Sequence, residues 1–462
     1  MKFFNTLSGK KEGFRSIRPE KVYLYTCGPT VYDYAHIGNF RAYIFEDLLK
    51  RALVFMGYEV KHVMNITDVD DKTIKKANSE GRSLREVTDK YIKAFFEDID
   101  TLNISRADHY PRATEHIKEM ADMVKILVQK GYGYQKNGSY YFDISKFNGY
   151  GKLAKINKNE LRTGERIESD EYEKKNAHDF ALWKKKKPDE PYWESDIGPG
   201  RPGWHIECSV MSTKYLGQPF DIHCGGVDNI FPHHENEIAQ SESFADKKFV
   251  NYWLHCHHLT VNGSKMSKSK GNYYTLRDLI KKGTDPMVIR YLLISTHYRK
   301  MLNFSFETLA QSEASLQRIR DFLCELKDRS VEPGENPLVE KMKDQAMTAF
   351  AESLSDDLNI SMALKAVFDF IRKINKLLSE NQIYTEDSKR IVSAFKKWDE
   401  VLGILPEDED TELEASIKEK IDRRNRARKE KNYALADKIR DELCKQGIIL
   451  EDTKDGVRWK KK

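Results

Sequence analysis

The sequence predicts an α/β protein in which a parallel-sheet domain is interrupted by an inserted subdomain, then followed by an all-α bundle and a small basic α+β module. Three observations predict this order: a strand–helix–strand unit near the N-terminus, a break in that rhythm after residue 135, and helices only after Thr308. The 462 residues suffice for about three domains of ordinary size. With 39% hydrophobic and 11% aromatic residues, the composition excludes a chain that is disordered throughout.

The N-terminal region begins with a strand, a helix and a second strand. Lys21–Cys27 is rich in aromatic and β-branched residues and is followed by a Gly-Pro breaker, which is typical of a strand. Phe40–Met56 carries apolar residues at helical spacing, and Glu59–Ile66 is the second expected strand. A further helix is expected to begin at Asp70. Two strands joined by a helix imply a parallel pair.

The alternation of strands and helices stops between residues 136 and 200. This stretch holds a short aromatic strand pattern, a polar run and four consecutive lysines, and we expect it to be an inserted connective subdomain. Residues 1–135 are then the first half of the sheet domain and residues 201–307 the second half. Strand patterns return at Phe220–Cys224 and Phe249–His258.

The C-terminal third changes character twice. Residues 308–405 carry apolar residues at helical spacing, so we expect a helical bundle. An acidic link leads to residues 413–462, which we expect to form a separate basic module. Within that module Ile417–Glu442 is expected to be helical, and Asp455-Gly456 between Ile448–Glu451 and Val457–Lys460 indicates a β-hairpin.

The net charge of +5 is unevenly distributed along the chain. From Ile417 to the C-terminus there are 16 Lys and Arg against 9 Asp and Glu, a local charge of +7, so the rest of the chain carries −2. A solvated tail and a phosphate-binding module both explain this asymmetry. No apolar stretch approaches the roughly 18 residues that cross a membrane, and no secretory segment is recognisable. We expect a cytoplasmic protein without a membrane partner.

Cysteines and histidines are concentrated in one window. Three of the six cysteines and seven of the thirteen histidines lie between His205 and His258. Because the thiols of a long cytoplasmic chain stay reduced, a disulfide framework is not expected. The window therefore indicates a metal or a catalytic centre.

Two short segments suggest phosphate chemistry. The sequence HIGN at His36–Asn39 lies where the first helix is expected to begin, and a helix N-terminus binds phosphate through unpaired N–H groups. Alone, such a four-residue match also arises by chance. The sequence KMSKS at Lys265–Ser269 lies in a polar loop bounded by glycines, and its two lysines suit a mobile lid over a leaving pyrophosphate. A surface loop that is merely basic is the alternative.

Together, and in this order on an α/β pattern, the two segments resemble the HIGH and KMSKS signatures of class I aminoacyl-tRNA synthetases. The resemblance implies a Rossmann-like catalytic domain that uses ATP with magnesium, where positioning and cations stabilise the developing negative charge. It implies His36, Lys265 and Lys268 as catalytic residues, and Gly38, Asn39, Asp228 and Lys268 as ATP-binding residues. Asn39 replaces the second histidine of the family and cannot become cationic.

Further motifs resemble those of the cysteinyl-tRNA synthetase family over nearly the whole chain. They are Cys27-Gly28 with TVYD at Thr30–Asp33, NITDVDDK at Asn65–Lys72, GWHIECS at Gly203–Ser209, DIHCGGVD at Asp221–Asp228 and FPHHENEIAQ at Phe231–Gln240. The resemblance implies a monomeric cysteine–tRNA ligase that forms cysteinyl-adenylate from L-cysteine and ATP and transfers cysteine to tRNA(Cys).

The family resemblance also implies one zinc ion that binds the substrate thiol. Its implied ligands are Cys27, Cys208, His233 and Glu237, and the residues implied to line the amino-acid pocket are Thr67 and Trp204. The residue chemistry supports part of this, because His233 and Glu237 share a helix face and all three residue types bind zinc. Spacing alone does not single out Cys27 as a ligand. It also does not favour His233 over His234. A soft metal separates thiol from hydroxyl where pocket shape cannot.

The same window holds further cysteines and histidines. We expect Cys224 and Cys256 to be ordinary buried thiols. The histidines His205, His255 and His258 either orient the zinc ligands or are satisfied core residues.

The C-terminal module resembles the anticodon-binding module of the family. Arg458, Trp459 and the helix Arg423–Lys431 are candidates for contacts with single-stranded bases and phosphates. Two rival functions remain: a related ligase that couples cysteine to a small amine, and a zinc-dependent nucleic-acid-binding protein without catalysis. The first would lack the extended C-terminal region, and the second would not need KMSKS.

Overall fold

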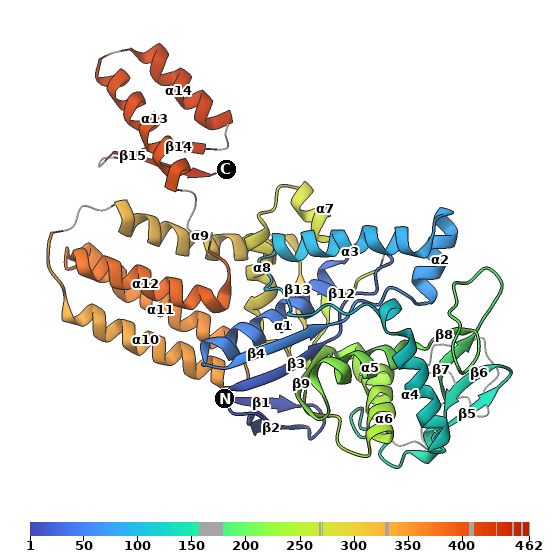
Figure 1. Ribbon diagram of the computed structural model, residues 1–462. Helices are drawn as coiled ribbons and strands as arrows, with labels where there is room; N and C mark the ends of the chain where they lie inside the picture. The colour runs from blue at the N-terminus through green and yellow to red at the C-terminus, as the bar shows by residue number, and fades with distance from the viewer. Residues whose placement is uncertain are drawn as a thin grey trace. The chain divides into compact units, whose positions relative to one another are not determined.

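The computed structural model describes residues 1–156, 179–267, 269, 271–328, 332–405, 411–430, 432–445, 448–453 and 456–461. The chain forms two compact units, Met1–Ile404 and Leu405–Lys462 (Figure 1). Within the described residues, no helix combines the length and apolarity needed to cross a membrane.

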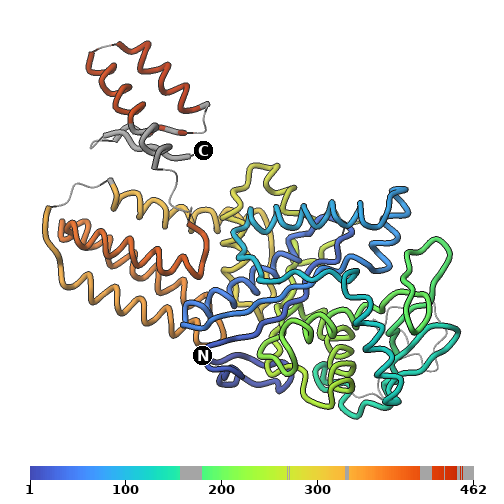
Figure 2. The backbone as a smooth tube through the Cα atoms, viewed as in Figure 1, coloured from blue at the N-terminus to red at the C-terminus, as the bar shows by residue number. Residues whose placement is uncertain are grey.

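The first unit is built on a four-stranded parallel sheet with the order β10-β9-β3-β4. Its strands are β3 (Lys21–Thr26), β4 (Glu59–Met64), β9 (Phe220–Gly226) and β10 (Val250–Cys256). The four strands expected from the sequence are therefore confirmed, with ends shifted by a few residues. Leu24 of β3 pairs with Ile222 of β9, so segments far apart in the chain lie side by side (Figure 2).

Eight helices accompany this sheet in the described part of the first unit before the bundle. They are α1 (Ile37–Phe55), α2 (Asp71–Glu80), α3 (Leu84–Thr101), α4 (Ile117–Gln129), α5 (Trp204–Leu216), α6 (Glu235–Ala245), α7 (Leu276–Lys281) and α8 (Pro286–Ser295). Helix α1 joins β3 to β4, and α6 joins β9 to β10 in the opposite direction along the sheet. Right-handed crossovers therefore place α1 and α6 on opposite faces (Figure 1).

The inserted subdomain contains a four-stranded antiparallel sheet. Its strands are β5 (Gly133–Lys136), β6 (Ser139–Phe142), β7 (Phe180–Lys185) and β8 (Gly200–Pro202). Phe142 stacks on Phe180 with ring centres 5.0 Å apart, and both rings belong to the core cluster that also holds Tyr25 of β3 and Phe220 of β9. The sheet extends a few residues beyond the predicted limits 136 and 200, and the domain boundaries themselves stay predictions.

Two smaller sheets complete the α/β part. The N-terminal hairpin consists of β1 (Lys2–Asn5) and β2 (Lys10–Gly13), and a three-stranded sheet consists of β11 (Leu259–Val261), β12 (Ser264–Lys265) and β13 (Leu302–Phe304). Strand β12 holds the first residue of the KMSKS segment, so this segment begins on a strand rather than in a free loop.

The expected all-α bundle is confirmed. Its helices are α9 (Phe306–Asp328), α10 (Pro337–Ser355), α11 (Ile360–Ser379) and α12 (Thr385–Leu402). Aromatic rings form its centre: Phe395 contacts Phe370, Phe322 and Trp398. Burying such rings contributes to the apolar packing that holds the four helices together.

A buried ion pair fixes the end of the bundle to helix α1. Arg290 of α8 is fully buried, and its Nη2 lies 2.6 Å from Asp47 of α1. The same guanidinium donates from Nε to the carbonyl of Leu402, the last residue of α12. Because α1 begins at the HIGN segment, this contact is one of those that position the helix carrying that segment.

The second unit is small and has its own core. It consists of α13 (Thr411–Lys429), α14 (Tyr433–Lys445), β14 (Ile448–Thr453) and β15 (Gly456–Lys461). Ile421, Ile439, Leu443 and Ile448 pack together. The expected hairpin is confirmed, because β14 and β15 pair antiparallel. Lys431 and the side chains of Arg458 and Trp459 lie outside the described part.

Most of Ile417–Glu442 is helical, as expected, but the helix is interrupted. The chain forms two helices, and α14 starts after Asn432. Asn432 accepts a hydrogen bond from the N–H of Leu435, while its own N–H donates to Ala427. Asparagine at a helix start competes with a continuous helix through such side-chain bonds, and helical periodicity does not reveal it.

Candidate active site

A cavity of about 960 Å³ opens at the carboxyl ends of the central strands. Cys27 directly follows β3, Asn65 follows β4, and Gly226 ends β9. The strand order reverses between β3 and β9, and this is where open α/β sheets bind ligands.

The fold brings together predicted site residues that are widely separated in the chain. Of those predicted residues that the structure describes, every one except Glu237 lines the cavity: Cys27, His36, Gly38, Asn39, Thr67, Trp204, Cys208, Asp228, His233 and Lys265. Glu237 lies behind the wall and contacts His233. Lys268 lies outside the described residues.

One end of the cavity, here called the signature end, consists of His36–Asn39 and Lys265–Ser267. His36 caps α1: its Nδ1 accepts a hydrogen bond from the N–H of Asn39, and Asn39 Oδ1 accepts one from the N–H of His36, both at 3.1 Å. This reciprocal cap fixes the imidazole at the helix N-terminus, where the helix dipole favours anions. Asn39 therefore has a structural role that the sequence did not indicate.

The first signature segment is joined through the backbone to residues that follow the second. Ile37 N–H donates to the carbonyl of Tyr274, and His36 pairs with Thr275 just before α7. A Cβ on Gly38 would lie 3.1 Å from Met266 Cε and 3.0 Å from the His36 ring. Glycine at this position therefore allows the two segments to approach each other closely.

Asp228 and His258 lie together near the end of β9. Both side chains are exposed, and His258 Nδ1 lies 3.9 Å from Asp228 Oδ1. A Cβ on Gly226 would lie only 2.4 Å from Asp228 Oδ1, so glycine makes room for this carboxylate at the cavity wall. Of the two explanations for His258, the structure supports neither a zinc-orienting contact nor a buried core position.

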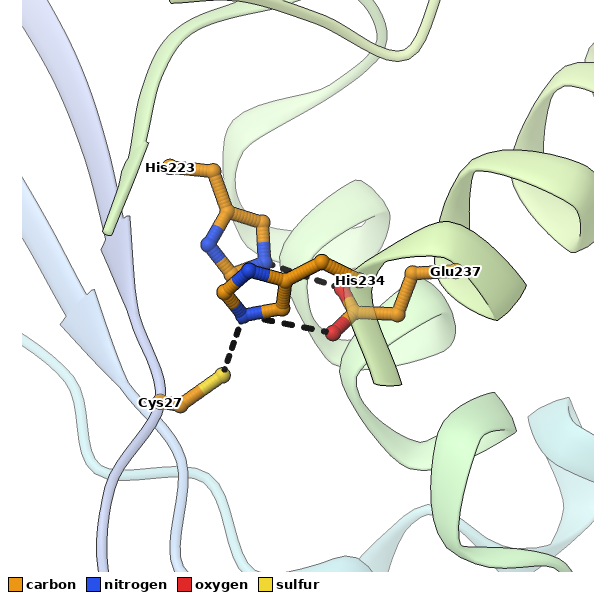
Figure 3. A group of neighbouring side chains, drawn as sticks. All are labelled: Cys27, His223, His234 and Glu237. Carbon is orange, nitrogen blue, oxygen red and sulfur yellow. Dashed lines mark hydrogen bonds and ion pairs between the residues drawn. The ribbon is translucent and has the colours of Figure 1, made fainter. Parts of the chain in front are cut away.

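The other end of the cavity, here called the sulfur end, consists of Cys27, Cys208, His223, His233, His234 and Glu237. Figure 3 shows four of them converging from β3, β9 and the start of α6. Glu237 is the centre: His223 Nε2 lies 2.9 Å from its Oε2, and His233 Nε2 lies 3.0 Å from its Oε1. Cys27 Sγ lies 3.2 Å from His234 Nε2.

Two overlapping groups at the sulfur end have ligand atoms close enough for one metal ion. One is Cys27, Cys208, His233 and Glu237, and the other is Cys27, His223, His234 and Glu237, with all ligand atoms of a group within 4.8 Å of one another. Only the first group has three members that line the cavity. A metal that also contacts a substrate needs such an open side. The geometry thus favours His233 over His234, which spacing left open.

Burial shifts the pKa values at the sulfur end in the directions that favour the uncharged forms of these side chains. It raises the pKa of Glu237 to about 8 and lowers the pKa of His233 to about 3. A hydrogen bond with Cys208, and then burial, raises the pKa of the Cys27 thiol well above its usual range. Glu237 Oε1 has no hydrogen-bond partner among the described residues despite its contact with His233. In the His233 tautomer whose proton is on Nδ1, His233 Nε2 and Glu237 Oε1 are both acceptors, and two facing acceptors fit a shared cation.

Histidines that the sequence could not classify are resolved here. His205 Nδ1 lies 2.9 Å from His233 Nδ1, and His255 Nε2 lies 2.8 Å from His234 Nδ1, so both orient another histidine. His223 is a further member of this cluster that sequence reasoning missed. Its position within the motif DIHCGGVD was the available signal. Cys224 and Cys256 are buried and belong to neither metal group, as expected for ordinary thiols.

The wall between β4 and α5 carries the two predicted amino-acid-pocket residues. Trp204 stacks on His233 with ring centres 4.2 Å apart. Thr67 is buried, and its hydroxyl donates to Glu207 Oε2 at 3.1 Å. Glu207 and Asn65, which complete this wall, were not singled out from the sequence, although both lie inside the motifs quoted above.

Comparisons with known proteins assign all three parts of the chain. Residues 13–314 match the family model of the "tRNA synthetases class I (C) catalytic domain", residues 349–406 match the "DALR domain", and residues 410–459 match the "Cysteinyl-tRNA ligase anticodon binding domain".

Similar proteins and structures agree with these matches. The chain is 51% identical to the cysteine–tRNA ligase of Chlamydia trachomatis, with 99% of both chains covered, and 51% identical to that of Brachyspira hyodysenteriae, with 100% of this chain and 99% of the relative covered. Among solved structures, methionyl-tRNA synthetase of Mycobacterium tuberculosis in complex with methionyl-adenylate has the same fold. Its TM-score is 0.60 at 16% identity, over 83% of this chain and 90% of that chain. With these relatives over its full length, the chain belongs to the cysteine–tRNA ligase family of class I aminoacyl-tRNA synthetases.

Proposed function

We propose that the chain is a cysteine–tRNA ligase that activates L-cysteine with ATP and then transfers the cysteinyl group to the 3′ end of tRNA(Cys). In the first step a carboxylate oxygen of cysteine attacks the α-phosphorus of ATP, cysteinyl-adenylate forms and pyrophosphate leaves. In the second step a ribose hydroxyl of the tRNA attacks the carbonyl carbon, and AMP leaves. The observation that carries this proposal is a single cavity with residues of both signature segments at one end and a cysteine–histidine–glutamate cluster at the other.

The signature end is proposed to bind the triphosphate. His36 caps α1 at a positive helix end, and Lys265 is exposed on the β12 side of the cavity. These groups neutralise charge that develops on the phosphates, so the residues need only orientation and no covalent intermediate. Gly38, Asn39 and Asp228 are proposed to hold the nucleotide, with Lys268 completing the signature.

The sulfur end is proposed to hold zinc through Cys27, Cys208, His233 and Glu237. Two sulfurs, one imidazole nitrogen and one carboxylate oxygen are a zinc-type ligand set, and the orphaned Glu237 Oε1 fits it. When bound, zinc would supply a soft Lewis acid that prefers a thiolate to a hydroxyl and so favours cysteine over serine. Trp204 stacks on His233 and restricts the direction from which a thiol enters.

The choice between the two metal groups has its own test. We expect His233→Ala to lower the affinity for zinc more than His234→Ala, because only His233 lies at the cavity side of the cluster. Competition with a chromophoric zinc chelator measures both affinities. The reverse order would assign the ion to the deeper group with His223 and His234.

The activation step is tested by ATP–pyrophosphate exchange. Purified protein is expected to exchange pyrophosphate into ATP with cysteine and to give less than about 1% of that rate with serine at equal concentration, since a thiol site rejects the hydroxyl. Exchange with another amino acid but not with cysteine would refute the proposal.

The basic second unit is proposed to bind the anticodon end of tRNA(Cys), and the full chain is proposed to act as a monomer. Arg423 and Arg426 are exposed on α13. The double variant Arg423→Glu with Arg426→Glu is expected to leave exchange unchanged but lower tRNA charging about tenfold at moderate salt.

The matched control for the tRNA test is Lys247→Glu with Lys248→Glu. It makes the same charge change at exposed residues just before β10, at the amino end of the sheet and away from the cavity. Equal loss of charging in both double variants would show that only net charge matters, and the proposed anticodon role would be wrong.

A further inference from the structure

Arg277 of α7 contacts one turn of α3 through two of its guanidinium nitrogens. Its Nε donates to Asp98 Oδ1 at 2.8 Å, and its Nη2 donates to Glu97 Oε2 at 2.7 Å and to the carbonyl of Ala94 at 3.2 Å. The three acceptors share one side of α3, because their spacing is that of a helix face. A planar guanidinium has donors in fixed directions, so Arg277 orients α7 against α3.

The same side chain also contacts the segment that precedes the first signature. The guanidinium carbon of Arg277 lies 5.0 Å from the centre of the Tyr34 ring, within the range of a cation–π interaction. Tyr34 also meets Tyr91 of α3 edge to face, with ring centres 5.4 Å apart. Since Tyr34 precedes His36 by two residues, Arg277 and α3 together hold the chain where it enters the signature end.

The start of α7 is in turn joined to His36. Thr275 caps α7, because its N–H and its hydroxyl both donate to Asp278 Oδ2, at 2.9 and 2.7 Å. Thr275 also pairs with His36, and the Tyr273 ring meets the His36 imidazole edge to face with ring centres 5.3 Å apart. Arg277 follows Thr275 by two residues. His36 is thus held from two sides by segments that Arg277 anchors to α3.

Stability alone is a poor explanation for these contacts. The Arg277 side chain is 39% exposed, and exposed ion pairs contribute little to the free energy of unfolding. Two fully buried apolar residues, Leu276 and Leu279, already attach α7 to the protein. Apolar burial has no preferred direction, whereas hydrogen bonds do. The contribution of Arg277 is therefore a defined position of the helix start.

We propose that Arg277 is a positioning residue that places the His36 imidazole for formation of the adenylate. This rests on the proposed function, because it takes ATP as the substrate and His36 as a donor to its phosphates. Arg277 does not line the cavity and acts through Thr275 and Tyr34. A shift of about 1 Å at a catalytic group can slow a reaction about 100-fold, so loss of this anchor lowers the rate without removing any group that touches ATP.

Arg106 provides the matched control. It also pairs with a carboxylate of α3, since its Nε and Nη2 lie 2.9 and 2.6 Å from the two oxygens of Asp100, and it lies 4.2 Å from the centre of the Phe96 ring. Its side chain is 43% exposed, close to the value for Arg277. Within the described residues its guanidinium makes no hydrogen bond to α7 or to either signature segment. Arg277→Gln and Arg106→Gln therefore remove the same charge and the same kinds of contact.

The rate is measured as pyrophosphate exchange at saturating ATP and cysteine on the full-length zinc-loaded protein. Arg277→Gln is expected to lower this rate about tenfold and to change the affinity for cysteine less than about threefold, whereas Arg106→Gln should change the rate less than about twofold. Arg277→Lys keeps the charge but not the planar fork, so it should restore part of the rate. In a His36→Asn background, Arg277→Gln should cost less than about twofold, because its effect passes through the imidazole.

Hydrogen exchange gives a second measurement that does not depend on catalysis. The N–H of Ile37, the first residue of α1, has no acceptor within its own helix and donates to the carbonyl of Tyr274 at 3.0 Å. Arg277→Gln should speed exchange of this amide, because the segment that carries Tyr274 is then less firmly anchored. Arg106→Gln should leave it unchanged.

The inference is overturned if Arg277→Gln keeps the wild-type rate or the wild-type exchange at Ile37, or if Arg106→Gln loses as much rate. It is also overturned if Arg277→Gln costs as much without the His36 imidazole as with it. Where Arg277→Gln does not fold, Glu97→Ala with Asp98→Ala takes its place, since it removes both carboxylates. An unchanged rate there has the same meaning. Failure of the proposed function is distinguishable, because the wild-type protein would then show no cysteine-dependent exchange, while the Ile37 amide would still test the anchor.

Discussion

The two ends of the cavity are built by different means. At the signature end, backbone groups hold His36 and Ile37 against the residues that follow Lys265–Ser267: His36 pairs with Thr275, and Ile37 N–H donates to the carbonyl of Tyr274. At the sulfur end, buried side chains make them, and His233 and Glu237 are 2% and 0% exposed. The first end is open to water, and the second is nearly dry.

This difference follows from what each end recognises. A triphosphate brings its own charge, so N–H groups at a helix start and exposed lysines suffice to bind it. A thiol is small and weakly polar, and it is separated from a hydroxyl only by ligand atoms whose protonation is controlled by burial. Damage to the sulfur end should therefore abolish selection of the amino acid, whereas damage to the signature end should slow the chemistry.

The largest expected effect is at Cys208. Cys208→Ala should lose zinc and lower cysteine-dependent pyrophosphate exchange at least about 1000-fold. Without this thiol the metal ion binds weakly, and the remaining buried ligands lose the positive charge that they bind together. Metal analysis and the exchange assay measure both. Cys224→Ala is the control, since Cys224 is equally buried but outside both metal groups. A full equivalent of zinc in Cys208→Ala would contradict the assignment of the sulfur end.

Metal removal tests whether the two ends are independent. After chelation, affinity for cysteine should fall at least about 100-fold, whereas affinity for ATP should change less than about threefold, because backbone contacts build the signature end. Calorimetric titration of each ligand into the metal-free protein measures this. Equal losses for both ligands would mean that the ends fold as one unit, and the comparison would fail.

A smaller effect is expected at His36. His36→Asn should lower the exchange rate about 100-fold, as for loss of one donor to developing charge. Asparagine still caps a helix, so α1 should keep its start. Zinc content and affinity for cysteine should stay at wild-type values. A loss of cysteine affinity as large as the loss of rate would show that His36 also shapes the sulfur end.

The smallest expected effect concerns stability beside the signature end. Asp98 of α3 accepts a hydrogen bond from Arg277 of α7 at 2.8 Å, and burial raises the pKa of Asp98 from 3.8 to about 6 despite this partner. The folded state therefore holds this proton more tightly than the unfolded chain. The resulting stabilisation is complete below pH 3.8 and is lost as the pH rises through 6.

The side-chain carboxamide of the variant Asp98→Asn does not titrate, so this pH-dependent loss of stability is absent from it. Relative to wild type, its free energy of unfolding should therefore rise by about 2 kcal/mol between pH 4 and pH 7. Urea unfolding at several pH values measures the difference. A difference that does not depend on pH would mean that the Arg277 contact fully offsets burial of the Asp98 carboxyl.

Local patterns predicted the elements because their causes are local. Alternation and helical spacing located β3, α1, β4 and β9 to within a few residues, since each pattern reflects one buried face. The break between α13 and α14 was missed because it depends on the side chain of Asn432, and the apolar spacing continues across it.

In the site, too, some features follow from local sequence and others depend on tertiary packing. Resemblance of whole motifs named the ligand set, yet spacing could not choose between His233 and His234, which are neighbours in the chain. Their rings diverge just after a kink in Ile230–His234, where the backbone of Phe231 is extended: His233 stacks on Trp204, and His234 contacts His255. Which ring faces the cavity depends on what packs around that turn.

The sequence by itself determined the order of the parts, the parallel sheet, the two signature segments and the concentration of thiols and imidazoles in one window. Only the tertiary structure decided that Asn39 helps to cap α1, that Glu237 lies behind the cavity wall, and that Thr67 donates a hydrogen bond to Glu207 at the cavity. Periodicity and motif are properties of neighbours along the chain. Protonation, lone pairs and access to a cavity depend on groups that meet only when β3, β4, β9 and α5 are packed together.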